Sequence, residues 1–150
     1  MTPARVVLDT NVLLDLWVFD DPGTRWLAAA VAAQRVRPLR TATIDAELVD
    51  VLERARFGLD LQRRQAILAA WQASSEHVRE APAAALVCSD PDDQKLLDLA
   101  LHARAPLLLT KDRALLKQRR RAHALGLAIA RPDAGASALL ERLVDDQDAA

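Results

Sequence analysis

The sequence of 150 residues has few of the side chains on which several classes of protein depend. Its one cysteine, Cys88, excludes an internal disulfide, and we therefore expect residence in the cytoplasm. The three histidines are scattered and form no zinc-binding motif. No apolar run is long enough to span a bilayer, and the N-terminus lacks the pattern of a secretory signal peptide. These absences disfavour a secreted, a zinc-dependent or a membrane protein.

Aromatic side chains and excess charge are also scarce. The sequence has two Phe, three Trp and no Tyr. With so few aromatic side chains, we do not expect it to bind single-stranded nucleic acid by stacking bases on them. The formal net charge of -1 excludes a uniformly basic surface but allows a local patch. The segment 111–123, KDRALLKQRRRAH, is such a patch. We expect it either to contact a nucleic-acid backbone or to form a solvated helix face; its cations are Arg113, Lys117, Arg119, Arg120 and Arg121.

The sequence does contain a regular alternation of apolar strands and amphipathic helices. Strands are predicted at 4–8, 37–42, 107–110 and 127–130, and the segment 77–90 reads as a loop with a brief extended piece at 86–88. Helices are predicted from Asn11, over 22–35, after a Thr43 cap, over 60–74, from Asp90 to about 104, over 112–122 and over 136–145. This order predicts one α/β domain over 1–150, with a mostly parallel sheet and helices on both faces.

Four acidic residues lie where a predicted strand gives way to a helix: Asp9, Glu47, Asp93 and Asp112. Each could simply stabilise a helix N-terminus, Glu47 from a first turn. In an open parallel sheet, however, the carboxyl ends of the strands line one ligand-binding crevice. Asp9 and Asp112 follow two buried strands and should be neighbours if those strands are adjacent. Gathered carboxylates favour a hard cation such as Mg²⁺ or Mn²⁺.

The ordered set of motifs resembles the PIN domain, and in particular its bacterial branch of toxin components in toxin–antitoxin pairs. The motifs are LDTNVLL, an acid in the helix after the second strand, DPDDQKLLDLALHA and LLLTKDRALL, and the likeness covers nearly the whole chain. It implies a three-layer α/β/α fold with a central sheet of four or five strands. It also implies an endoribonuclease that depends on one or two Mg²⁺ or Mn²⁺ ions.

The resemblance assigns roles to residues by position. Asp9, Glu47, Asp93 and Asp112 match the four acids that hold the metal, and Asn11 and Thr110 match polar positions beside the first and the fourth. Two assignments have competitors nearby: Asp45, Asp50 and Glu53 for Glu47, and Asp90 and Asp92 for Asp93. We prefer Asp93 because, three residues after an Asp90 cap, its side chain can turn back towards the strand ends.

The resulting hypothesis is hydrolysis of RNA phosphodiester bonds. Thr110 would donate its hydroxyl to a carboxylate or the substrate, and Asn11 would hold the loop around Asp9. Crowded carboxylates without metal should have raised pKa values. The resemblance implies a cognate antitoxin as partner and allows a homodimer. Trp17, Phe19 and Trp26 are interpreted as core residues, or as an apolar patch for a partner if they are exposed.

Two other functions fit parts of the same pattern. A phosphorylatable receiver-type signalling domain also uses strand-end acids, with a Thr and a Lys that Thr110 and Lys111 would match. It normally has an acidic pair after its first strand, where Asp9 stands alone before Thr10, and a phosphorylatable Asp at the end of a third strand. The other rival is a PIN-like fold that has lost activity and serves as a binding module, which the presence of all four acids disfavours.

Overall fold

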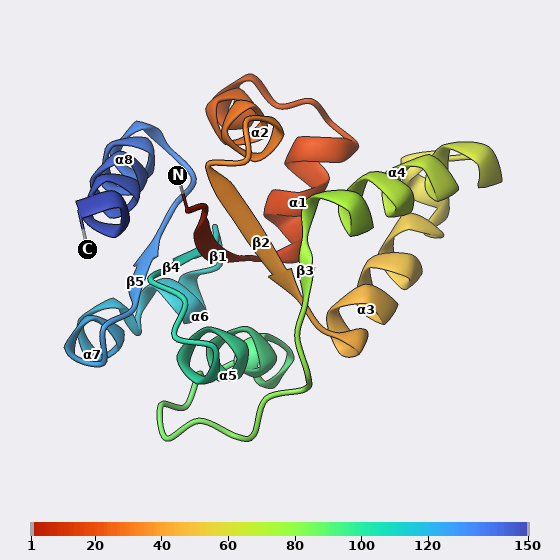
Figure 1. The fold of residues 1–150 in the computed structure, drawn as a ribbon. Coiled ribbons are helices and arrows are strands. Elements are labelled where there is room, and N and C mark those ends of the chain that lie inside the picture. The colour runs from red at the N-terminus through yellow and green to blue at the C-terminus, as the bar shows by residue number, and fades with distance from the viewer. Residues whose placement is uncertain (1, 150) are drawn as a thin grey trace.

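A five-stranded parallel sheet forms the centre of the molecule (Figure 1). The structure is a computed structural model that describes residues 2–149, without the side chains at 55, 147 and 149. Its strands are β1 (Ala4–Leu8), β2 (Val36–Arg40), β3 (Glu76–His77), β4 (Leu107–Leu109) and β5 (Ala128–Ala130). They lie in the order β3-β2-β1-β4-β5, and each neighbouring pair is parallel. The predicted α/β fold with a parallel sheet is therefore confirmed.

Helices cover both faces of this sheet, as Figure 1 shows. One face carries α1 (Thr10–Trp17), α2 (Arg25–Ala32) and α8 (Ala134–Ala149). The other carries α5 (Gln94–His102) and α7 (Arg119–Ala124), and the short α6 (Arg113–Leu116) follows β4. Beyond β2, α3 (Ala42–Leu52) and α4 (Leu61–Ser74) form a helical pair. Three 3₁₀ turns complete the described elements: η1 (Pro22–Thr24), η2 (Ala55–Phe57) and η3 (Pro91–Asp93).

The apolar runs that predicted the strands become the core. Val6 and Val7 of β1 and all three leucines of β4 are fully buried between the helical layers, as expected for strands with helices on both faces. Each such side chain contributes about 1.5–3 kcal/mol relative to an exposed position. The single cysteine, Cys88, is also buried. No helix in the described part of the chain combines the length and the apolar character needed to cross a bilayer.

Several predicted boundaries differ from the observed ones. The Thr43 cap is wrong, because β2 ends at Arg40 and Thr41 takes the extended conformation of a cap, accepting a hydrogen bond from the Ile44 N–H at 3.2 Å. Thr43 instead donates its hydroxyl to Glu80 at 2.8 Å. The ambiguous segment contributes only β3 at its start, and 86–88 forms no strand.

Other corrections concern helix continuity and exposure. The helix predicted over 22–35 is the turn η1 followed by α2, and that over 112–122 divides into α6 and α7 at Gln118, whose backbone leaves the helical region. The final helix begins earlier and runs longer than predicted. Phe19 is not a core residue, since 56% of it is exposed beside the Phe57 ring, whereas Trp17 and Trp26 are partly buried.

Candidate metal centre

The centre lies where the strand order changes direction. β1 has β2 on one side and β4 on the other, so the connections diverge at its carboxyl end, and crevices at such points bind ligands in open α/β sheets. Leu8 lies opposite Leu109, and the Asp9 N–H donates to the Leu109 carbonyl at 3.0 Å. Parallel pairing therefore places Asp9 beside Thr110, and Asp112 follows two residues later.

Asp9 is a buried carboxylate, 6% exposed, held by a neighbouring strand end. It stands at the N-cap position of α1 without a side-chain capping bond; Thr110 instead donates its hydroxyl to Asp9 Oδ2 at 2.7 Å. Burial raises the pKa of Asp9, the charges of Asp112 and Glu47 add to this effect, and the Thr110 hydroxyl opposes it. Asp9 is therefore a candidate functional residue for two reasons: it follows the end of β1, and its buried, acidic surroundings raise its pKa.

Thr110 ties two acids together. Its hydroxyl is fully buried, donates to Asp9 and accepts from the Asp112 N–H at 2.9 Å. Asp112 in turn caps α6, where its Oδ1 accepts from the Ala114 N–H at 2.7 Å. The role of Asp112 as a helix cap is thus confirmed, and its second oxygen is left for another contact.

Asp93 completes a carboxylate cluster at this point. One carboxylate oxygen from each of Asp90, Asp93 and Asp112 lies within 4.8 Å of the others. Burial, pairing with the Asp112 carboxyl group, and the charges of Asp9, Asp112 and Asp90 together raise the pKa of Asp93 to about 7. Asp93 Oδ2 is buried and has no hydrogen-bond partner among the described residues.

This donor set fits a hard divalent cation. It consists of carboxylate oxygens, and the oxygen without a donor, Asp93 Oδ2, faces the cost of buried charge that a cation would remove. Asp90 caps η3 through the Asp92 N–H at 3.0 Å and also belongs to the cluster, whereas Asp92 is exposed. The structure therefore brings Asp90 and Asp93 together and leaves Asp92 apart.

Glu47 reaches the centre from α3. It lies in the second turn of this helix, not the first as predicted, because the helix starts at Ala42. Its Oε1 accepts from the Thr10 hydroxyl at 3.1 Å, and its Oε2 lies 2.6 Å from the ammonium of Lys95 on α5. Sequence reasoning missed Lys95, because no spacing in the sequence connects α3 to α5.

The competitors of Glu47 lie elsewhere. Asp45 accepts from the Trp71 indole N–H at 2.9 Å and pairs with Arg40 at 2.6 Å, so both of its oxygens are engaged by residues outside the carboxylate cluster. Asp50 and Glu53 are exposed. Of the four acids in this segment, Glu47 is the one whose charge acts on Asp9.

Two further residues flank the centre. Asn11 lies exposed in the first turn of α1. Lys111, between Thr110 and Asp112, forms an ion pair with the buried Asp15 of α1, which holds the loop of both site residues against that helix. Sequence reasoning also missed this pair. Lys111 and Asp15 line a neighbouring cavity of about 550 Å³, together with Asp21, Gly23, Thr24, Trp26, Arg131, Pro132, Asp133, Ala134 and Ser137.

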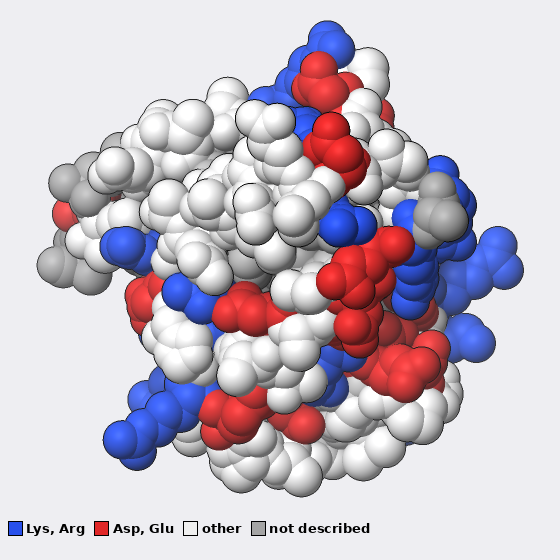
Figure 2. Space-filling model, turned by 90° about the vertical axis from the view of Figure 1, so that its right-hand side faces the viewer, with Lys and Arg blue, Asp and Glu red and all other residues white. Residues whose placement is uncertain are grey.

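The wider surface is mixed in charge. Figure 2 shows the side of the molecule that carries α3 and α4, where Asp and Glu side chains gather in a patch with Lys and Arg side chains beside it. The basic segment around α7 is exposed, and no ion pair to an acidic side chain within residues 2–149 engages its arginines at 119–121.

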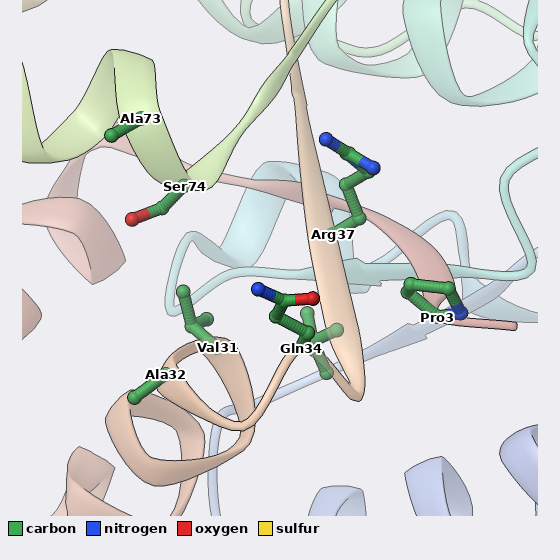
Figure 3. A pocket seen from close by; sticks show the side chains of 8 residues that line it. Pro3, Val31, Ala32, Gln34, Arg37, Ala73 and Ser74 are labelled. Atoms are coloured by element: carbon green, nitrogen blue, oxygen red, sulfur yellow. The ribbon is translucent and has the colours of Figure 1, made fainter. Parts of the chain in front are cut away.

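A second cavity lies at the opposite edge of the sheet. It measures about 230 Å³, and Figure 3 shows Val31 and Ala32 of α2 across from Ala73 and Ser74 at the end of α4. Pro3, before β1, and Val36, the first residue of β2, place it at the amino ends of the strands. Its lining contains no acidic residue and is completed by Gln34 and Arg37. This cavity is separate from the carboxylate centre.

Comparisons with known proteins agree with this architecture. The family model described as PIN domain matches residues 5–114. A solved structure, the crystal structure of VapBC2 from Rickettsia felis bound to a DNA fragment from their promoter, is similar with a TM-score of 0.57 and 14% sequence identity. That match covers 83% of this chain and 96% of the other, and at this identity it shows the fold alone. The comparison with curated proteins gives no match.

Proposed function

Because this chain belongs to the PIN domain family, we propose that it is an endoribonuclease that depends on Mg²⁺ or Mn²⁺ and hydrolyses RNA phosphodiester bonds. The observation that carries the proposal is the buried oxygen Asp93 Oδ2, which lacks a donor inside a cluster of three carboxylates. A fold that only needed helix caps would gain nothing from this oxygen. A cation-binding site explains why it is there.

The carboxylates at the strand ends would hold the cation. Asp9, Asp93 and Asp112 are the proposed central ligands, with Asp90 as a further member of the cluster and Glu47 at its border. A divalent ion in such a site lowers the pKa of a bound water and stabilises the charge that gathers on the phosphate. Mg²⁺ and Mn²⁺ suit an all-oxygen donor set that leaves positions for water and substrate.

Hydrogen bonds and an ion pair within the chain orient the acidic side chains of this site. The Thr110 hydroxyl fixes the orientation of Asp9 through one bond and the start of α6 through the other. Burial and the neighbouring acids raise the pKa of Asp93 to about 7 in the metal-free protein, and a cation held by this carboxyl group would favour its ionised form. Lys111, paired with Asp15, keeps the loop between Thr110 and Asp112 in place. Asn11, in the first turn of α1, would hold the segment after Asp9.

We also infer that the protein acts as the toxin of a toxin–antitoxin pair and has a cognate antitoxin as partner. The likeness in fold to the VapBC2 structure supports this inference. A further support is the exposed Phe19, whose ring lies 5.7 Å from that of the partly buried Phe57, measured between centroids. An exposed aromatic side chain is suited to a protein interface, either with an antitoxin or with a second copy of the chain.

The receiver-type alternative has no support in the fold. In a receiver, a phosphorylatable Asp ends a strand, but residues 78–106, all described, contain no strand, and Asp90 and Asp93 lie in a 3₁₀ turn. The loss-of-activity alternative is a possible outcome of the test below. It would show metal binding without cleavage.

The proposal is tested with purified protein on a panel of defined RNAs, in the presence of Mg²⁺, Mn²⁺ or EDTA. We expect cleavage with either ion, none in EDTA, and none in Asp9→Asn at equal folded fraction. Asp50→Asn is the matched control, since it removes an exposed carboxylate from α3 outside the cluster and should leave cleavage unchanged. Full cleavage by Asp9→Asn, or cleavage by the wild type in EDTA, would refute the proposal.

A further inference from the structure

A positively charged side chain of the protein itself, Lys95, lies at the carboxylate centre. Lys95 lies on α5, two residues after Asp93, and its ammonium is 2.6 Å from Glu47 Oε2. The same ammonium donates to the backbone carbonyl of Asp92. Lys95 and Glu47 are 26% and 36% exposed, so the contact lies at the rim of the site and not in the core. This arrangement ties α5, which follows Asp93, to α3.

The contact leaves Glu47 with no free oxygen. Its Oε2 is held by Lys95, and its Oε1 accepts the Thr10 hydroxyl at 3.1 Å. Asp93 Oδ2, by contrast, is buried without a donor. Asp93 and Glu47 therefore differ: Asp93 Oδ2 has no partner, whereas a cation that approached Glu47 Oε2 would meet the ammonium of Lys95. An ammonium and a divalent ion would then compete for the same carboxylate.

We propose that Lys95 is a built-in counter-cation of this centre, which positions Glu47 in the metal-free protein and competes with the divalent ion for it. Lys95 is thus a positioning residue that acts through Glu47, and the strength of metal binding depends on the exchange. The inference deepens the proposed function and rests on it, because it concerns the same site.

The direction of the effect separates this role from a purely structural one. Removal of the Lys95 charge frees Glu47 and removes a positive charge that repels the incoming ion, so the metal should bind more tightly. In a water-like dielectric, a +1 charge about 6–12 Å from a +2 ion corresponds to a change of roughly three- to tenfold in the affinity for that ion. If Lys95 only braced α5 against α3, its loss would loosen Glu47 and weaken metal binding.

The experiment is a titration of Mn²⁺ by electron paramagnetic resonance or calorimetry, on the full chain without RNA. We expect Lys95→Met to bind Mn²⁺ about three- to tenfold more tightly than the wild type, and Lys95→Arg to bind close to the wild type. In the Glu47→Gln background the gain from Lys95→Met should be smaller, because only the direct repulsion between the ammonium and the ion remains. Equal or weaker binding by Lys95→Met, or the same gain in both backgrounds, would overturn the inference.

Two further measurements keep the outcomes distinct. Thermal unfolding in EDTA checks that the variants fold, as expected for an ion pair this exposed, which contributes little to stability. The Lys95 side-chain NMR signal of the wild type should move on addition of Mg²⁺ as the ammonium leaves Glu47, and an unchanged signal at saturation counts against the exchange. If the wild type binds Mn²⁺ but Lys95→Met binds no tighter, only this inference fails. If the wild type binds no Mn²⁺ at millimolar concentration, the proposed function fails with it.

Discussion

Replacement of Thr110 by Val tests the hydrogen bonds that organise the two strand-end acids. Val has nearly the shape of Thr, so the fully buried site keeps its packing and loses only the hydroxyl. The variant removes the donor at 2.7 Å from Asp9 Oδ2 and the acceptor of the Asp112 N–H at 2.9 Å.

The expected cost follows from the kind of bond that is lost. A hydrogen bond to a charged group contributes about 1.5–3 kcal/mol, and an unpaired N–H at a part-buried position adds about 1 kcal/mol. We therefore expect a loss of roughly 3 kcal/mol in the free energy of unfolding at pH 8 in EDTA. For a chain of this length that corresponds to a fall of about 6–12 °C in Tm.

The dependence on pH gives the prediction a second check. The Thr110 hydroxyl lowers the pKa of Asp9, against the larger raising effect of burial, so it favours the carboxylate over the neutral acid. The pKa of Asp9 should therefore be higher still in Thr110→Val. The stability difference between wild type and variant should be largest at high pH and should shrink as the pH falls and Asp9 takes up a proton.

The assay is urea unfolding at several pH values, with Thr110→Ser as the control that keeps the hydroxyl and loses one methyl group. Thr110→Ser should retain the pH dependence of the wild type and lose only about 1 kcal/mol. A Thr110→Val variant as stable as the wild type at pH 8, or a loss that does not change with pH, would show that the hydroxyl does not support an ionised Asp9.

Three further predictions concern charge and the hydrogen-bonded core. Because the pKa of Asp93 rises from 3.8 to about 7 on folding, the metal-free protein should lose stability as the pH rises from about 4 through 7, and Asp93→Asn should flatten this part of the urea-unfolding profile. Replacement of the arginines at 119–121 by Ala should weaken RNA binding and reduce the salt dependence of log Kd by up to about 2, if all three contact phosphates; an unchanged slope would favour a solvated helix face. Trp71→Phe removes the bond to Asp45 and should cost about 1–2 kcal/mol in unfolding assays, without altering Mn²⁺ affinity.

The parts of the fold that were predictable are those coded by local pattern. β1 and β4 follow from the apolar runs 6–8 and 107–109, because a strand covered by helices on both faces buries consecutive residues. β3 was missed because its two residues, Glu76 and His77, carry no apolar signal and pair with β2 only once the chain has returned from α4. The break at Gln118 was missed because neither Gly nor Pro marks it.

The site shows the same division between local and tertiary information. Asp9 and Asp112 could be expected together because each follows a strand that the sequence reveals, and parallel pairing then fixes their proximity. Glu47 could not be distinguished from Asp45 by pattern, since both lie on α3 and differ in which neighbours they meet. Lys95 and Asp15 were not predicted at all, because their partners, Glu47 and Lys111, are far away in the sequence.

The choice between helix caps and metal ligands is not exclusive, because a carboxylate has two oxygens. Asp112 and Asp90 each use Oδ1 for a backbone N–H at a helix start and still contribute an oxygen to the cluster. Asp93 differs from both: its side chain makes no capping bond, its Oδ2 is buried without a donor, and its raised pKa shows that the fold works against its charge. Capping therefore accounts for Asp90 and Asp112 in part and for Asp93 not at all. For this reason Asp93, more than either strand-end acid, is the residue whose unpaired oxygen a bound cation would explain.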